Sequence, residues 1–340
     1  MLGRLTFSRA HIGAGVRLMS ASTIRYNKTV ENNLSTETNR LAKTLTKFWD
    51  KVDTAEIDGK LEVQLDGKPL RTPAGFNLAL PSQKHILATL VANEWANLPD
   101  LKVKTNALPL TSVVARAVDL ETISGPRKNL SEATIASYDE IRAKIGDVDD
   151  IRTNILRYLD TDTCLIFAPA DEYEGKLRQR QLELYIPLRE EFESFFSAWA
   201  AKNGLAGAPI TLEFLDCEEH DIRGNKQNIA TQAIVLNWVQ SLNMYELVSL
   251  ERAILTSKLF LCGAALLRLN CLDEARMKEI FQVNKSCPEE YYFAEIEDIV
   301  ELGNLETIFQ TGEWGEVEDT HDVDKVDWLR NLTSAALLSH

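Results

Sequence analysis

The sequence predicts an α+β protein in which a small N-terminal α+β domain with an antiparallel β meander precedes a larger all-α domain. Two observations carry this prediction. Near residues 60–80 hydrophobic and polar residues alternate, which is the period of a half-buried strand, whereas after residue 128 hydrophobic residues recur with a helical period. At 340 residues, 45% of them hydrophobic, the chain is long enough for one large or two moderate domains. We place the division at Gly125-Pro126, the clearest break, between domains over 46–125 and 126–330.

The N-terminal segment has the composition of a targeting sequence. Residues 1–30 carry five positive charges and no Asp or Glu, with small, hydroxylic and apolar residues between them. This is typical of a mitochondrial transit peptide; a disordered basic tail is the alternative. Residues 31–45 are polar and are expected to form a disordered linker. Removal of the transit peptide would lower the formal net charge from −14 to −19, because five positive charges leave with it.

Strands are expected first after the linker, with order beginning near Trp49. Residues 61–65 alternate between apolar and polar, and Asp66-Gly67 supplies the positive φ angles of a tight hairpin turn. Residues 73–75 form a second turn, and residues 76–80 alternate again. These segments predict a three-stranded antiparallel meander.

Two helices are expected to complete the N-terminal domain. The first covers 83–97, with Ser82 as its N-cap and Pro99 after its end. Its predicted inward stripe consists of Ile86, Leu87, Leu90, Val91 and Trp95. The second covers 109–122 and opens with Pro109, which the first turn of a helix accepts. Its predicted inward residues are Leu110, Val113, Val114 and Ala117.

The C-terminal domain is expected to be helical throughout. Helices are predicted at 128–145, 150–168, 177–202, 226–241, 244–269, 273–284, 289–302 and 304–311, and a short strand or extended linker at 210–215. Pro187 is expected to kink or start the longest helix, whose inward residues are Leu188, Phe192, Phe195, Phe196 and Trp199. The longest uncharged run in the most apolar region, Leu259 to Leu267, is less than half of the roughly 20 residues that a bilayer requires, so no membrane insertion is expected.

Composition and motifs exclude several function classes. A net charge of −14 argues against a nucleic-acid partner, since phosphate binding needs clustered cations. The sequence has no phosphate-cradling GxxxxGK[ST] loop, no GxSxG nucleophile elbow and no HExxH zinc helix. The five cysteines are odd in number and form no CxxC pair, which fits a reducing compartment without a disulfide framework.

The C-terminal region is strongly acidic. From Glu289 to Asp327 there are fourteen carboxylates and one basic residue, Lys325. An apolar patch is predicted from Leu305, Ile308, Phe309 and Trp314, with Glu306, Glu313 and Glu316 at its border. Aromatic anchors inside a charged rim are typical of a specific protein interface. The alternative is that the aromatic residues only dock this helix on the domain core, and both roles are compatible.

One acidic cluster invites a metal interpretation. Its members are Glu316, Glu318, Asp319, His321, Asp322 and Asp324. Hard oxygen ligands with a histidine would suit a divalent cation, and a metal-dependent matrix hydrolase is therefore the alternative function. The spacing lacks the glycine and the terminal glutamate of an EF-hand loop, so a solvated acidic segment or a partner-binding surface is favoured.

Three motifs, in order, carry a family resemblance. They are the segment Leu65 to Gly75, the pair Leu108-Pro-Leu-Thr-Ser112 and Ala115-Arg-Ala-Val-Asp119, and the block Gln310 to Gly315. Together they resemble the mitochondrial ATP synthase F1 complex assembly factor 2 family, the assembly chaperones of the F1 α subunit. The resemblance covers Phe48 to Lys325, and the run from Trp314 to Lys325 is similar to the fungal members. Lys258 and Arg268 depart from the small residues that the family usually has there.

The resemblance implies a matrix chaperone that binds the newly imported F1 α subunit and prevents its aggregation until it pairs with β. It implies no cofactor, no catalytic residues and no turnover, and we expect the free chain to be monomeric. The acidic position ahead of the family's Phe-Gln pair corresponds to Glu306. The candidate client-binding residues are Glu306, Phe309, Gln310, Trp314 and Glu316. A passive structural subunit of a matrix complex is a further alternative.

Overall fold

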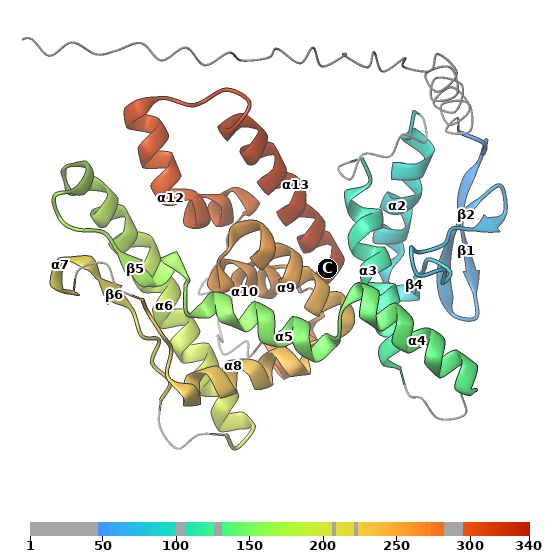
Figure 1. The fold of residues 1–340 in the computed structure, drawn as a ribbon, viewed down its shortest axis with the longest axis horizontal. Helices are drawn as coiled ribbons and strands as arrows, with labels where there is room; N and C mark the ends of the chain where they lie inside the picture. The colour runs from blue at the N-terminus through green and yellow to red at the C-terminus, as the bar shows by residue number, and fades with distance from the viewer. Residues whose placement is uncertain are drawn as a thin grey trace, which may run out of the picture. The chain divides into compact units, whose positions relative to one another are not determined.

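A computed structural model describes the chain over 47–99, 107–125, 131–205, 209–220, 224–271, 273–281 and 295–340 (Figure 1). The predicted transit peptide and linker lie outside the described residues. The elements of the first part are β1 (Val52–Ile57), β2 (Lys60–Leu65), β3 (Lys68–Pro69), β4 (Ala79–Pro81), α2 (His85–Asn97), α3 (Pro109–Ser124), α4 (Glu132–Ile145) and α5 (Val148–Leu156). The later elements are β5 (Ile166–Phe167), α6 (Lys176–Lys202), β6 (Leu215–Asp216), α7 (Cys217–His220), α8 (Ile229–Ser241), α9 (Met244–Ser257), α10 (Phe260–Leu269), α11 (Glu274–Ile280), α12 (Ile296–Trp314) and α13 (His321–Ser339). A small antiparallel sheet followed by helices confirms the predicted α+β class.

The N-terminal sheet is built around β2. Strand β1 pairs antiparallel with the whole of β2, while β3 and β4 follow one another along its other edge. The prediction of a three-stranded meander missed β1 and the return of β4 to β2. Asp58-Gly59 joins β1 to β2 with φ angles of 51° and 74°, and Asp66-Gly67 joins β2 to β3 with 49° and 75°. The same turn chemistry therefore builds both hairpins, and Asp58-Gly59 is the local sequence signal for the first of them.

Helices α2 and α3 pack against this sheet (Figure 1). Helix α3 begins at Pro109 as predicted, and its predicted inward residues are all buried. In α2 the buried residues are Leu87, Ala88 and Val91, whereas the side chain of Ile86 is 50% exposed, so its predicted place in the stripe is wrong. Ser82 opens a 3₁₀ turn that ends at Lys84 and does not cap α2. The later start of the α-helix leaves Ile86 in a first turn that faces solvent.

Helix α9 forms the centre of the helical core and contacts α3, α5, α10 and α13 (Figure 1). Residues 245–251 are all buried. The predicted continuous helix over 244–269 is wrong, because the chain breaks at Lys258, whose φ of 64° is left-handed. Ser257 Oγ accepts a hydrogen bond from the Leu259 amide at 3.2 Å and so fixes the turn into α10. Among the described helices, none is long and apolar enough to cross a membrane.

Other predicted helices change in length. The helix predicted over 150–168 ends at Leu156 and gives way to two 3₁₀ turns and β5, which pairs in parallel with β6. The helix α6 runs through Pro187 without starting there, and its five predicted inward residues are buried. Helix α11 ends at Ile280, short of the predicted residue 284.

The C-terminal end differs most from the prediction. The helices predicted over 289–302 and 304–311 form one helix within the described residues, α12, interrupted at Asn304. Helix α13 was not predicted. The acidic residues in its first half are typical of a solvated segment without regular structure. Its second half is apolar and packs on α9, where Ser249 Oγ donates to the Ala335 carbonyl at 2.7 Å.

Candidate functional site

Helix α12 is kinked at Asn304, where φ and ψ are −110° and 16°. Just before the kink the Leu302 carbonyl accepts a hydrogen bond from the Tyr185 hydroxyl of α6 at 3.1 Å. A Cβ on Gly303 would lie 2.7 Å from the ring of Trp328 on α13. A glycine therefore allows α13 to approach the kink. Contacts with α6 and α13 therefore hold α12 just before the kink.

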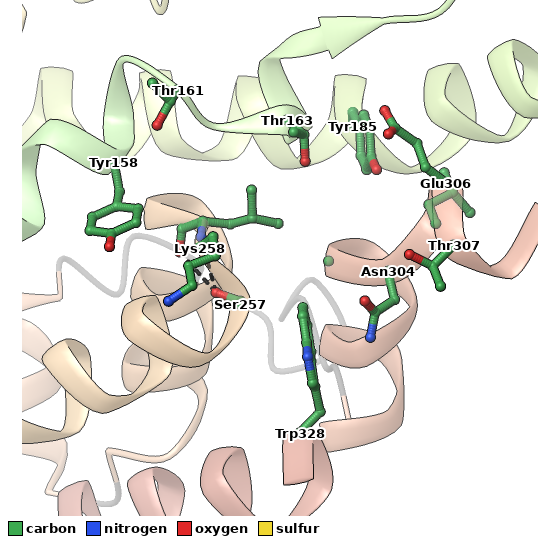
Figure 2. A pocket seen from close by; sticks show the side chains of 13 residues that line it. Tyr158, Thr161, Thr163, Tyr185, Ser257, Lys258, Asn304, Glu306, Thr307 and Trp328 are labelled. Carbon is green, nitrogen blue, oxygen red and sulfur yellow. Dashed lines mark hydrogen bonds between the residues drawn. The ribbon is translucent and has the colours of Figure 1, made fainter. Parts of the chain in front are cut away.

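Glu306 follows the kink and lines a cavity of about 450 Å³ (Figure 2). The other walls include Tyr158, Tyr185 and Trp328. In Figure 2 Glu306 comes from α12 and Tyr185 from α6, and both line the same cavity. Glu306 is exposed as a residue, yet burial of its carboxyl group raises the pKa of that group, and repulsion from Glu172 adds to the shift. A cationic side chain entering this cavity would relieve both effects.

Phe309 and Trp314 meet on the far side of the kink through Tyr173. The ring centroids of Tyr173 and Phe309 are 5.7 Å apart, and those of Tyr173 and Trp314 are 6.3 Å apart. Tyr173 lies in a left-handed loop, with φ angles of 50° at Tyr173 and 57° at Glu174. Phe309 is half-buried, whereas Trp314 is 74% exposed. The loop thus holds Phe309 against the protein and leaves Trp314 exposed to a binding partner.

Five apolar side chains of α12, α13 and the loop between them are exposed. They are Ile308, Trp314, Val317, Val323 and Val326, with exposed fractions of 45–74%, and we call them the α12–α13 patch. Leu305, predicted to belong to this patch, is instead 2% exposed and lies in the core. The turn after the kink places Leu305 inward. The remaining patch lies among exposed carboxylates, including Glu313 and Glu316.

The predicted client-binding residues therefore separate into groups. Glu306 lines the first cavity, while Phe309 and Trp314 share Tyr173 and Phe309 lines a second cavity of about 700 Å³. Gln310 and Glu316 are exposed. Sequence reasoning missed Tyr158, Tyr173, Tyr185 and Trp328. Nothing in their local sequence indicates that residues so far apart in the chain meet α12.

The acidic cluster considered as a metal site is not assembled. Among the residues that the structure describes, no group of three or more His, Cys, Asp or Glu side chains is arranged to hold a metal ion. The Nδ1 atom of His321 instead accepts a hydrogen bond from the Val317 amide at 2.9 Å. This bond closes the turn before α13. The cluster therefore gives the hydrolase alternative no geometric support.

Comparisons with known proteins place the chain in a family. A family model described as the ATP12 chaperone protein matches residues 46–193. The chain is 39% identical over 322 residues to "Protein ATP12, mitochondrial" of Saccharomyces cerevisiae, covering 94% of this chain and 91% of the yeast protein. The chain belongs to the ATP12 chaperone family. This confirms the resemblance inferred from the sequence motifs.

Further relatives agree with membership of the ATP12 family. "Protein atp12, mitochondrial" of Schizosaccharomyces pombe is 32% identical over 293 residues, which cover 86% of this chain and 81% of that protein. The crystal structure of Atp12 from Paracoccus denitrificans matches with a TM-score of 0.57 and 20% identity, over 88% of this chain and 98% of the bacterial chain. A point mutant of the same bacterial protein matches with a TM-score of 0.56 and 21% identity. At these identities the two structures support the fold alone.

Proposed function

We propose that this chain is an assembly chaperone for the F1 sector of the mitochondrial ATP synthase. It binds the newly imported α subunit in the matrix and prevents its aggregation until it pairs with β. Membership of the ATP12 family and the mitochondrial names of two relatives support this proposal. The acid-free N-terminal segment supports import into mitochondria. The chain acts by binding and carries out no chemical reaction.

The observation that carries the proposal is that α12 presents both Glu306, which lines the first cavity, and the exposed Trp314 near its end. Burial of the Glu306 carboxyl group favours a cationic partner, so an Arg or Lys of the client fits the first cavity. Trp314, 74% exposed, offers the apolar anchor of an interface. Charge accelerates the encounter with a basic surface of the α subunit, and the apolar contacts set how long the complex lasts.

Release is built into the same arrangement. The residues of the α12–α13 patch alternate along the chain with exposed carboxylates, which suits a complex of moderate lifetime. A chaperone must release its client when β arrives. We propose that β competes for a surface of α that α12 covers beforehand, so that release requires no change in this chain.

The test uses the full chain with isolated F1 α subunit, followed by addition of F1 β subunit. Light scattering reports aggregation of α, and size exclusion reports complexes. The proposal predicts suppressed scattering, a complex of this chain with α, and loss of that complex when β is added. Continued aggregation of α without any complex would refute the choice of client. A complex that persists in assembled ATP synthase would instead favour the structural-subunit alternative.

A further inference from the structure

The second cavity, of about 700 Å³, lies between the turns of α12 after the kink and the loop before α6. Its apolar lining consists of Tyr173, Ile308 and Phe309, and its charged lining consists of Asp171, Glu174, Lys176 and Glu313. No residue lines both this cavity and the first one. The two cavities are therefore separate sites that share one helix.

The aromatic side chains of the second cavity suit a cation. The ring centroids of Tyr173 and Phe309 lie 5.7 Å apart, and the exposed ring of Trp314 lies 6.3 Å from Tyr173. The face of an aromatic ring carries partial negative charge and attracts ammonium and guanidinium groups. An aromatic wall of this kind also offers apolar contact to the carbon atoms of a Lys or Arg side chain.

The charges of the lining favour a cation as well. Three carboxylates and one ammonium group line the cavity, which gives the lining a net charge of −2. Lys176 pairs with Glu174 at 2.6 Å, and this hydrogen bond is the largest cause of the raised pKa of Lys176; attraction to Glu313 contributes least. Among the described residues, Asp171 and Glu313 form no ion pair. Two carboxylates therefore remain for a cation from outside the described chain.

The Tyr173 hydroxyl interacts with carboxylates of both cavities. Burial raises the pKa of this hydroxyl, and repulsion from Glu172, Glu313 and Glu306 adds to the shift. Glu306 lines the first cavity and Glu313 lines the second. The negative charge around Tyr173 is thus continuous from one cavity to the other, and bound cations would reduce the repulsion.

Tyr173 is fixed in an unusual backbone conformation. Tyr173 and Glu174 have φ angles of 50° and 57°, in the left-handed region that residues other than glycine rarely adopt. Gly175 continues the loop with a φ of 79°, and a Cβ there would lie 3.1 Å from the Ala170 carbonyl oxygen. The loop therefore holds the Tyr173 ring near Phe309 in spite of backbone strain. Strained residues of this kind are common where a protein positions side chains for a ligand.

The spacing along α12 favours a polypeptide as the ligand. Glu313 follows Glu306 by seven residues, which places the two positions about 10 Å apart along the helix axis. An extended polypeptide advances about 3.3 Å per residue, so two basic residues three positions apart span the same length. A polypeptide also supplies apolar contacts for the exposed Ile308 and Trp314. A free polyamine supplies the cations without those contacts.

We propose that the second cavity binds a basic side chain, Arg or Lys, of the same polypeptide segment that places another basic residue in the first cavity. The cation in the second cavity lies against the ring of Tyr173 and pairs with Glu313. The segment therefore carries two basic residues about 10 Å apart. That this segment belongs to the F1 α subunit rests on the proposed function; binding of a peptide with two basic residues does not.

The test measures binding of short, blocked, dye-labelled peptides to the full chain by fluorescence anisotropy. One peptide has two arginines three positions apart. Its counterpart has citrulline at both positions, which keeps the shape of arginine and removes the charge. We expect the citrulline peptide to bind at least about tenfold more weakly, because two charge-assisted contacts are lost. Equal binding of the two peptides would overturn the proposal whatever the variants do.

Substitution of Tyr173 locates the second cation. Tyr173→Leu removes the aromatic face and is expected to weaken the arginine peptide about fivefold while leaving the citrulline peptide unchanged. Tyr173→Phe keeps the aromatic face and should stay within about twofold of the unmodified chain. A purely structural role of Tyr173 would weaken both peptides alike, and that result would overturn the proposal. Equal affinities of the two variants for the arginine peptide would also overturn it.

Substitution of Glu313 tests the carboxylate. Glu313→Gln is expected to weaken the arginine peptide about threefold. Glu297→Gln is the matched control, since Glu297 lies on the same helix before the kink, is exposed and lines neither cavity. Equal effects of the two substitutions would overturn the pairing with Glu313. Spermidine that displaces the arginine peptide at the peptide's own concentration would show a site for free polyamines and overturn the choice of a polypeptide.

These results separate the second cavity from the proposed function. If the arginine peptide binds as expected while the α subunit aggregates regardless, the second cavity stands and the choice of client fails. If α is protected while Tyr173→Leu leaves binding of the arginine peptide unchanged, the client assignment stands and the proposal for the second cavity fails.

Discussion

Helices α9 and α12 use polar and apolar side chains in opposite ways. On α9 the carboxylates are buried and paired: Glu246 with Arg276 at 2.6 Å and Glu251 with Arg116 at 2.5 Å. On the last turns of α12 the apolar residues Ile308 and Trp314 are exposed. The difference indicates that α9 contributes to stability and that the end of α12 is available for binding. Substitutions on α9 should therefore lower stability, whereas substitutions at the end of α12 should weaken client binding.

The largest expected loss of stability comes from a substitution on α9. Glu246 is the N3 residue of its capping box, and its carboxylate pairs with Arg276. Glu246→Ala would leave Arg276 partly buried without this partner and is expected to lower the free energy of unfolding by about 3–5 kcal/mol. Glu279→Ala is the control, since Glu279 lies 3.8 Å from the same arginine but is 69% exposed. We expect that substitution to change the free energy by less than about 0.5 kcal/mol. Urea denaturation measures the free energy of unfolding of both variants. Equal losses would contradict the distinction between the buried Glu246 and the exposed Glu279.

The free energy of unfolding is expected to depend on pH through the carboxyl group of Asp162. Asp162 is fully buried, accepts hydrogen bonds from the Cys164 and Leu261 amides, and has a pKa raised by burial to about 6. Its contribution to stability is fully present below the unfolded pKa near 4 and is lost as the pH rises through 6. The loss is about 3 kcal/mol, at about 1.4 kcal/mol per pKa unit.

The measurement is the unfolding free energy between pH 4 and 8 for the unmodified chain and for Asp162→Asn. The difference between the two should change by about 3 kcal/mol between pH 4 and 7, in the direction of a relatively more stable variant at the higher pH. A difference that is independent of pH would show that Asp162 keeps its ordinary pKa.

The kink of α12 is expected to tolerate no added atoms at Gly303. A Cβ there would lie 2.7 Å from the Trp328 ring, so Gly303→Ala should cost about 1–3 kcal/mol through overpacking. Gly312, on the same helix, has nothing within 4 Å of an added Cβ. Gly312→Ala is expected to stabilise by about 0.5–1 kcal/mol through helix propensity. Thermal denaturation distinguishes the two, and a neutral Gly303→Ala would contradict the close approach of α13.

The smallest effect on stability is expected at Trp314. Because Trp314 is 74% exposed, Trp314→Ala should change the unfolding free energy by less than about 0.5 kcal/mol while weakening binding of the α subunit. Ile229→Ala on α8, where Ile229 is 78% exposed, removes a comparable apolar group outside the patch. If both variants lost α binding, or if neither did, Trp314 would not be a specific anchor for the α subunit.

Sequence patterns predicted the elements whose local signals are strong. Helix α3 follows its starting proline and its apolar period, and α6 follows its aromatic stripe. The patterns failed where tertiary contacts decide. The break at Lys258 depends on a left-handed residue that glycine would normally signal, and α13 depends on burial of its second half against α9.

The candidate site was predicted only in part for the same reason. Glu306 and Trp314 lie in one recognisable sequence block, which predicts both as candidate client-binding residues. Tyr173 and Trp328 reach α12 from a loop and from α13, so their proximity depends on the fold. Leu305 was misplaced because the helical period does not reveal the kink at Asn304.

The most direct measurement is the dissociation constant of the F1 α subunit for the full chain and for Glu306→Lys. Glu190→Lys on α6 is the control, since Glu190 is exposed and undergoes the same change of charge outside the cavities. We predict that Glu306→Lys weakens binding at least about tenfold without lowering the thermal midpoint, because a cationic client group would meet a cation. Glu190→Lys should stay within about twofold of the unmodified chain. Equal affinities of the two variants would contradict the assignment of α12 as the client-binding surface.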